Sequence, residues 1–209
     1  MPNDQPFVFI VDDDEVIRTS LSRALTMRGF SVRSYASAEA FLAAYDPDEP
    51  GCLVLDYGMP QMTGLELQQR LVDEDKPIPI IFVTGHGGVP ESVQAMKLGA
   101  IDFLEKPFKQ ETLIDRIGIA FEADAQTRAG RAAAREARAR FDRLTEREQE
   151  IMLFLVKNPS ATSSKDVARS LDISPRTVDH HRSRILEKME VRSVVELVDV
   201  SRSTGLFSE

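Results

Sequence analysis

The chain has 209 residues and 42% hydrophobic content, enough for one large domain or two small ones without covalent cross-links. Its single cysteine, Cys52, excludes an internal disulfide and indicates a reducing compartment. The run "GCLVLD" around it is typical of a buried strand, so we interpret the thiol as a core group rather than a reactive one. No apolar run reaches the roughly 20 residues of a membrane helix, and the N-terminus has no secretory pattern, so we expect a soluble, cytoplasmic protein with no membrane partner.

Charge is divided unevenly along the chain. Residues 1–125 carry 21 acidic and 10 basic side chains, a net charge of −11, whereas the remainder carries 13 and 16, a net charge of +3. This asymmetry indicates an acidic regulatory or catalytic half joined to a half that can approach a polyanion. A net charge of +3 does not by itself identify a nucleic-acid-binding domain.

The first part of the chain alternates short apolar runs with segments of helical period. Strands are predicted at 7–11, 31–35, 52–56, 78–84 and 102–106, and helices near 16–27, 38–44, 64–73, 89–98 and from 110 onward. Helix boundaries have their own signals: Ser37 as an N-cap, a capping box from Thr63 to Glu66, and stops at Gly29 and Gly99. Five β/α repeats predict an α/β fold with a parallel sheet covered by helices on both faces.

Residues 122–143, "EADAQTRAGRAAAREARARFDR", are rich in Ala and Arg and nearly free of strand formers. This composition favours a helix, and its few apolar residues indicate a solvated helical linker. The alternative, an arginine-rich arm that binds RNA, is less favoured because four acidic residues dilute the positive charge. These are Glu122, Asp124, Glu136 and Asp142.

The last part of the chain predicts a compact helical unit. A capping box from Thr145 to Glu148 opens one helix, and "SSKDVARSL" follows as a short helix. After the turn "LDIS", a longer helix begins with Ser174 as N-cap and Pro175 at the first helical position. A short helix, a tight turn and a longer helix form the helix-turn-helix pattern, and a final helix near 193–201 closes the core.

Polar residues follow four of the five predicted strands. Ligands of an open parallel sheet bind outside the carboxyl ends of its strands, so these side chains should meet at one edge. Carboxylates suit Mg²⁺, while a hydroxyl and an ammonium group suit phosphoryl oxygens. Any one acidic residue is adequately explained as loop solvation, but the agreement of the whole edge predicts a cation and phosphate site. The residues are Asp12, Asp13, Asp14, Asp56, Thr84 and Lys106.

Several motifs resemble a known family. "VDDDE", "LVLDYGMPQMTG", "VTGHG" and "GAIDFLEKPF" closely resemble the receiver domain of two-component response regulators. "LTEREQEI" and "SPRTVDHHRSRI" resemble the LuxR-type output domain, and the whole chain outside the linker resembles the FixJ branch of the NarL/FixJ family. The resemblance implies a flavodoxin-like (βα)5 receiver domain at 5–122, a helical linker at 123–142 and a smaller all-α helix-turn-helix DNA-binding domain at 143–205.

The resemblance implies a phosphorylation site. Asp56 would be the phosphoacceptor, and Mg²⁺ would offset the repulsion between its carboxylate and the incoming phosphoryl group. The ligands of this ion would be Asp12, Asp13, Asp56 and the backbone carbonyl of Gly58. By contrast, Asp14 and Glu15 are explained as the acidic first turn of the next helix.

The same resemblance implies a switch. Lys106 would pair with the acyl phosphate, and the Lys106–Pro107 peptide would be cis. Thr84 would move toward the phosphoryl group together with Phe103, although Phe103 is also explained by core packing. Gly87 and Gly88 would leave the intervening loop mobile. Dimerisation would then follow through the fourth helix and the fifth strand.

The predicted recognition helix presents its polar residues on one arc and Val178, Ile185 and Met189 on the other. By the resemblance, DNA-backbone contacts come from Thr177, His181, Arg184, Lys165 and Lys188, base-facing positions from Asp179, His180 and Ser183, and Arg176 lies on the same arc.

Two features depart from the family. Asp179 stands where Lys is common, so it alters base specificity or turns outward. The loop from Lys157 to Ser164 is longer than usual, which would shift Lys165 relative to DNA. A zinc site is not favoured, because the adjacent His180 and His181 cannot share one helix face.

We therefore predict a response regulator rather than an enzyme. A cognate sensor histidine kinase phosphorylates Asp56, the protein forms a homodimer, and the dimer binds double-stranded promoter DNA and regulates RNA polymerase, more often as an activator. Two alternatives are an Mg²⁺-dependent phosphatase and a DNA-binding protein that acts without phosphorylation. The C-terminal half also resembles a sigma-factor region, but the receiver motifs argue against that reading.

Overall fold

The computed structural model describes residues 5–85, 89–160 and 162–207. By internal contacts the chain divides into two units, residues 1–127 and 128–209. Among the described residues, no helix is long and apolar enough to cross a membrane.

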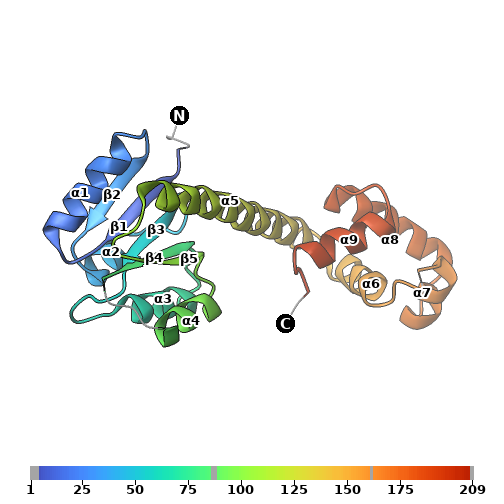
Figure 1. Ribbon diagram of the computed structural model, residues 1–209. Coiled ribbons are helices and arrows are strands. Elements are labelled where there is room, and N and C mark those ends of the chain that lie inside the picture. The colour runs from blue at the N-terminus through green and yellow to red at the C-terminus, as the bar shows by residue number, and fades with distance from the viewer. Residues whose placement is uncertain (1–4, 86–88, 161, 208–209) are drawn as a thin grey trace. The chain divides into compact units, whose positions relative to one another are not determined.

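The N-terminal unit is built on a five-stranded parallel sheet with the order β2-β1-β3-β4-β5 (Figure 1). This is the strand order of flavodoxin-like folds, as predicted. Its strands are β1 (Phe7–Val11), β2 (Ser31–Tyr35), β3 (Gly51–Asp56), β4 (Ile80–Thr84) and β5 (Asp102–Glu105). Its helices are α1 (Glu15–Thr26), α2 (Ala38–Ala44), α3 (Gly64–Asp73), α4 (Val89–Lys97) and the first part of α5 (Gln110–Phe141), which continues into the second unit.

Two separate cores lie on the two faces of this sheet. Successive strand residues point to opposite faces, so Val8 and Ile10 pack with α1 and α5, whereas Phe9 and Val11 pack with α2, α3 and α4. Cys52 is fully buried, and burial raises the pKa of its thiol, which confirms its interpretation as a core residue.

The predicted boundary signals are confirmed. Ser37 caps α2, and a complete capping box from Thr63 to Glu66 opens α3. Gly29 and Gly99 have φ angles of 91° and 89°, a left-handed conformation that favours glycine where a helix stops. Position 64 requires glycine for a different reason: a Cβ atom there would lie 2.6 Å from the Asp56 carbonyl oxygen. Its small size lets α3 start against the end of β3.

Residues predicted as a linker continue the last helix, since α5 runs without interruption from Gln110 to Phe141. The helical prediction is therefore confirmed. The expectation that this segment is solvated is wrong at Asp124, Ala137 and Phe141, which are buried. The Asp124 carboxylate accepts a hydrogen bond of 2.9 Å from the backbone N–H of Gly51, at the start of β3. The helical pattern of Ala and Arg in this segment gives no indication that Asp124 contacts Gly51, because the two residues are 73 positions apart.

The C-terminal unit contains α6 (Glu146–Lys157), α7 (Ser164–Leu171), α8 (Pro175–Met189) and α9 (Val194–Ser203). A capping box from Thr145 to Glu148 opens α6, and Ser174 with Pro175 opens α8, both as predicted. Asp172 ends α7 with a φ of 53°, which makes the tight turn before α8. The core includes Ile151, Val167, Val178, Ile185, Met189 and Leu197, so the apolar face predicted for α8 is confirmed.

Candidate functional site

The carboxyl edge of the sheet brings three predicted residues together. Asp12 follows β1, Asp56 ends β3, and Lys106 follows β5. The Lys106 ammonium donates to Asp12 Oδ2 at 2.9 Å and to Asp56 Oδ1 at 2.8 Å. All three side chains are largely buried, with exposed fractions of 2% for Asp12, 12% for Asp56 and 20% for Lys106. One cation therefore joins two carboxylates from neighbouring strands.

The remaining carboxylate oxygens are held by the backbone. Asp12 Oδ1 accepts from the N–H of Asp14 at 2.9 Å, and Asp56 Oδ2 accepts from the N–H of Gly58 at 2.7 Å. The guanidinium of Arg18 donates to the Asp12 carbonyl oxygen at 2.8 Å. Arg18 was not predicted as a site residue, although it closes the loop that carries the carboxylates. Its place one helical turn into α1 was the only signal.

Burial and charge act on these groups in opposite directions. Burial raises the pKa of Asp12 by more than its hydrogen bond to Lys106 lowers it. Burial lowers the pKa of Lys106, but its hydrogen bonds to Asp56 and Asp12 outweigh burial and leave that pKa raised. The ion pairs therefore favour the charged form of Lys106, whereas burial disfavours the charged form of Asp12.

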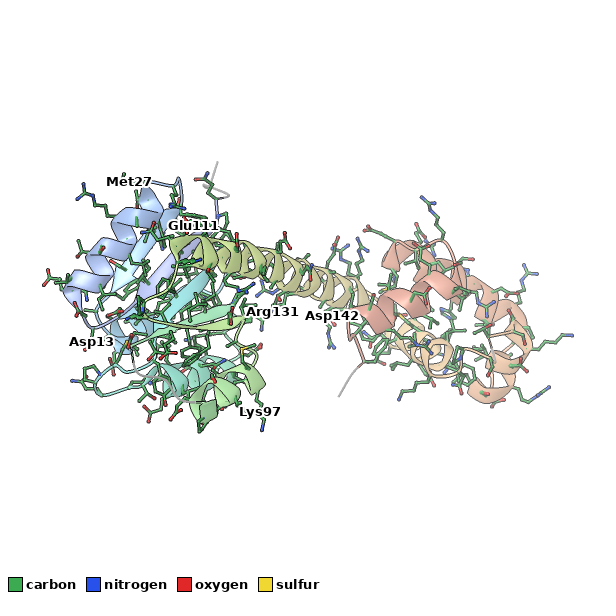
Figure 2. The ribbon with its side chains drawn as sticks, viewed as in Figure 1. Asp13, Met27, Lys97, Glu111, Arg131 and Asp142 are labelled. Carbon is green, nitrogen blue, oxygen red and sulfur yellow. The ribbon has the colours of Figure 1, made fainter. Side chains whose placement is uncertain are left out.

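The two acidic residues after Asp12 lie in different surroundings. Asp13, labelled in Figure 2, is exposed on the loop between β1 and α1. Asp14 is the N-cap of α1, since its side chain accepts hydrogen bonds from the N–H groups of Val16 and Ile17. The assignment of Asp14 to the start of the helix is confirmed, which leaves Asp12, Asp13 and Asp56 as candidate metal ligands.

The donor set suits Mg²⁺ by its chemistry. Asp12, Asp13 and Asp56 offer only carboxylate oxygens, the ligands that this hard cation prefers. Three carboxylates against one Lys106 ammonium leave the site anionic, which favours a divalent cation. In the part of the chain that is described, no three acidic, His or Cys side chains are grouped closely enough to form a preassembled metal site.

The predicted switch residues lie beside this edge. Thr84 is the last residue of β4 and is buried, and its carbonyl oxygen accepts from the Lys106 N–H at 2.7 Å. Phe103 is partly buried on β5, with its ring centroid 6.1 Å from that of Tyr57 and 5.8 Å from that of Phe82. Phe103 thus touches the residue that follows Asp56. The Lys106–Pro107 peptide is cis, as expected, whereas Gly87 and Gly88 lie outside the described residues.

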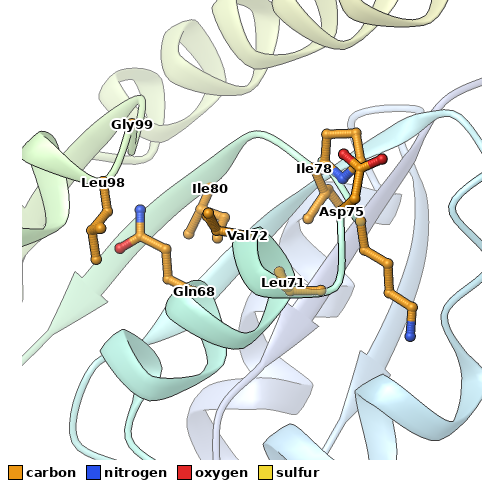
Figure 3. A pocket seen from close by; sticks show the side chains of 10 residues that line it. Gln68, Leu71, Val72, Asp75, Ile78, Ile80, Leu98 and Gly99 are labelled. Carbon is orange, nitrogen blue, oxygen red and sulfur yellow. The ribbon is translucent and has the colours of Figure 1, made fainter. Parts of the chain in front are cut away.

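A separate cavity of about 220 Å³ lies between the end of α3, the start of β4 and the end of α4 (Figure 3). Figure 3 shows the side chain of Gln68 extending toward Leu98 and Ile80, and its amide donates to the Ala95 carbonyl oxygen at 3.2 Å. No predicted site residue lines this cavity. It is smaller than the roughly 300 to 1,000 Å³ of most ligand pockets, and its lining offers no charged group that the phosphorylation chemistry would use.

In the C-terminal unit, α8 presents the predicted polar arc. Arg176, Asp179, His180, Ser183 and Arg184 are exposed, whereas Thr177, His181 and Lys188 are partly buried. Lys165 is exposed on α7. A helix-turn-helix unit with such an arc can enter the major groove of DNA.

Several of these predicted DNA contacts have partners within the unit, among them Arg184, whose guanidinium donates to Glu187 Oε2 at 3.2 Å. The Lys188 ammonium donates to Glu148 Oε2 at 2.6 Å and to the Arg143 carbonyl oxygen at 3.3 Å. The Asp179 carboxylate accepts a hydrogen bond from the hydroxyl of Ser164. The sequence places Glu148 and Ser164 only at the starts of helices. Their contacts with Lys188 and Asp179 span 40 and 15 positions, so no local pattern of residues predicts them.

Comparison with protein families agrees with the two units. Residues 8–118 match the response regulator receiver domain, and residues 142–201 match the luxR family of bacterial regulatory proteins.

Individual proteins are similar over nearly the whole chain. The transcriptional regulatory protein FixJ of Rhizobium meliloti (strain 1021) is 44% identical, with 95% of this chain and 96% of that protein covered. Among solved structures, the response regulator StyR is 39% identical with a TM-score of 0.79, covering 95% of this chain and 98% of that one. Full-length FixJ from B. japonicum is 38% identical with a TM-score of 0.57, covering 97% and 98%.

Proposed function

Because the chain belongs to the response regulators that join a receiver domain to a LuxR-type DNA-binding domain, we propose that phosphorylation of Asp56 switches its binding to promoter DNA. The observation that carries this proposal is the position of Asp56. It ends the central strand β3, and its carboxylate is held by the Lys106 ammonium and the Gly58 N–H. A cognate sensor histidine kinase is the proposed phosphoryl donor.

The proposed chemistry is a phosphoryl transfer between two side chains. An oxygen of Asp56 forms the new P–O bond while the P–N bond to the histidine of the kinase breaks. When bound, Mg²⁺ supplies the positive charge that offsets repulsion between the carboxylate and the phosphoryl oxygens. Asp12, Asp13, Asp56 and the Gly58 carbonyl would hold this ion. Lys106 already faces Asp56 and would pair with the transferred group.

Phosphorylation adds about −1.5 to −2 charges and three acceptor oxygens, which attract donors near Asp56. The Thr84 hydroxyl is proposed as one of these donors. Phe103 would respond because its ring packs between Phe82 and Tyr57, the neighbour of Asp56. The resulting change at α4 and β5 would favour a homodimer.

In the proposed DNA complex, α8 enters the major groove. His180 and Ser183 would face bases, whereas Lys165, Thr177, His181 and Arg184 would contact phosphates, with Arg176 on the same arc. Lys188 would contribute less, because its ammonium is engaged by Glu148. A homodimer would bind a two-fold promoter site and act on RNA polymerase as an activator. The domain limits 5–122, 123–142 and 143–205 and a cytoplasmic location remain predictions.

Phosphoryl labelling tests the assignment of Asp56. The chain would be incubated with a small donor such as phosphoramidate and Mg²⁺, and the incorporated phosphate would be located by mass spectrometry. Asp56→Asn should abolish labelling, because an amide is too weak a nucleophile. Asp115→Asn, on the exposed surface of α5, is the matched control and should be labelled normally. Labelling that persisted in Asp56→Asn would refute the assignment.

Promoter affinity tests the switch itself. Genomic footprinting with and without the phosphoryl donor should show protection that strengthens on phosphorylation. Equal protection in both samples would instead support a regulator that binds DNA without phosphorylation.

A further inference from the structure

Two side chains of the recognition helix hold the loop that precedes α7. The Asp179 carboxylate accepts from the hydroxyl of Ser164, the first residue of α7. One turn further along α8, the Arg182 guanidinium donates to the carbonyl oxygen of Thr162. Positions i and i+3 lie on the same side of a helix, so both bonds come from one face of α8.

The start of α7 is also held by its own N-cap. Ser163 is the N-cap of α7, and its hydroxyl accepts from the N–H of Asp166 at 3.2 Å. The next residue after Ser164 is Lys165, which is exposed. The bond between Ser164 and Asp179 therefore adds to the core contacts of Val167 and Val178 in placing the start of α7, and with it Lys165, against α8.

The contact between loop and helix is closely packed. The Arg182 Nε atom is buried without a hydrogen-bond acceptor in the described part of the chain. Leaving a buried donor unpaired is costly, but another nitrogen of the same guanidinium, Nη2, donates to the Thr162 carbonyl oxygen. The two bonds from α8, at Asp179 and Arg182, thus hold neighbouring residues at the start of α7.

We infer that Asp179 is a positioning residue, which fixes the start of α7 and Lys165 against the recognition helix instead of reading a base. A carboxylate that faces DNA repels phosphates, whereas one that accepts a hydrogen bond from Ser164 is already engaged. This inference rests on the proposed contact between Lys165 and DNA.

The test uses the full chain and a duplex that the wild-type protein selects from a random-sequence pool. Affinity for this duplex is measured over a range of salt concentrations for Asp179→Ala, Ser164→Ala, Lys165→Ala and the Ala double variants that include Asp179. Ser170→Ala, an exposed serine on α7, is the control for a serine change. Circular dichroism confirms that each variant is folded, and a repeated selection gives its base preferences.

We expect Asp179→Ala and Ser164→Ala each to weaken binding about three- to tenfold at all sequences, as for one misplaced phosphate contact. The double variant should be no weaker than either single variant, since both remove one bond. Asp179→Ala should lower the salt slope by about 1, and Lys165→Ala should add nothing in that background. Asp179→Asn keeps an acceptor for Ser164 and should bind nearly as the wild type does.

A shift of the preferred base at one position in Asp179→Ala would overturn the inference, because Ala removes a base contact without adding one. Unchanged affinity in Ser164→Ala would overturn it too. If Lys165→Ala leaves the salt slope of the wild type unchanged, the proposed Lys165 contact fails separately. The base preferences still decide the role of Asp179 in that case.

Discussion

At the carboxyl end of β1, neighbouring aspartates differ in burial because the chain changes from strand to helix within three residues. Asp12 directly follows β1, is buried and is paired with Lys106. Asp13 is exposed on the turn, and Asp14 caps α1. Repulsion among these three carboxylates is reduced because Asp12 is paired with Lys106, Asp13 is exposed to solvent, and Asp14 accepts hydrogen bonds from the first turn of α1.

Asp13 provides a test of the magnesium proposal. Saturating Mg²⁺ should stabilise the N-terminal unit, by about 2.7 kcal/mol at a concentration of 100 times Kd. Asp13→Asn should remove most of this gain without unfolding the unit, because the side chain is exposed. Thermal denaturation with Mg²⁺ and with a chelator measures the difference. Asp14→Asn is the matched control, since Asn also serves as an N-cap and the change removes one adjacent charge. If Asp13→Asn and Asp14→Asn lose the same amount of Mg²⁺ stabilisation, the ion responds to the overall negative charge of the loop and Asp13 is not a specific ligand.

Glu148 is a buried carboxylate that accepts two hydrogen bonds. They come from the Lys188 ammonium at 2.6 Å and from the Thr145 N–H at 2.8 Å, the second being part of the capping box. Burial raises the pKa of Glu148, but the bonds to Lys188 and Thr145 outweigh burial and leave it below its ordinary value of 4.5. A folded-state pKa below the unfolded one stabilises the fold above pH 4.5, and this stability is lost as the pH falls through the lowered value.

Glu148→Gln should therefore destabilise the C-terminal unit by about 1.5 to 3 kcal/mol at pH 7. The difference from the wild type should shrink as the pH falls below 4.5, where the wild-type carboxylate becomes protonated. Urea denaturation at several pH values measures this difference in the free energy of unfolding. Glu150→Gln, in an exposed pair with Arg147 on the same helix, should cost less than about 1 kcal/mol. A cost for Glu148→Gln that does not change with pH would contradict the assignment.

At the scale of elements, α5 is fastened to the sheet by a polar contact as well as by its apolar face. Leu113, Ile117 and Ala120 pack on the sheet, and Asp124 accepts from the Gly51 N–H beyond them. A Cβ at Gly51 would lie 2.3 Å from the Phe7 carbonyl oxygen, so β3 can start beside β1 only with glycine there. The helix therefore caps the start of the central strand.

Asp124→Ala should leave the buried Gly51 N–H without its acceptor and cost about 1 to 3 kcal/mol in the stability of the N-terminal unit. Asp124→Asn retains an acceptor oxygen and should cost less. Chemical denaturation followed by a probe of the sheet separates the two variants. If both cost the same, the charge of Asp124 rather than its hydrogen bond to Gly51 matters.

At the scale of the whole molecule, the chain has cores that share no residues. Two lie on the faces of the sheet, and the third lies within the helical C-terminal unit. Units with separate cores unfold separately unless an extensive interface couples them. The full chain should accordingly show two calorimetric transitions.

Variants can assign these transitions. Asp124→Ala should lower the midpoint of one transition and Glu148→Gln that of the other, because their contacts lie in different units. Differential scanning calorimetry of each variant measures both midpoints. A single transition that both variants shift would show instead that the units unfold as one.

The sequence by itself determined the elements, the sheet class, the helix caps and the edge that gathers Asp12, Asp56 and Lys106. These depend on short-range signals, namely hydrophobic period, capping residues and the rule that strand ends share one edge. Only the tertiary structure decided which groups pair: Lys106 with Asp12 across 94 positions, Asp124 with Gly51, and Asp179 with Ser164. Pairing across such separations depends on how packed elements meet, and a local pattern of residues carries no record of that.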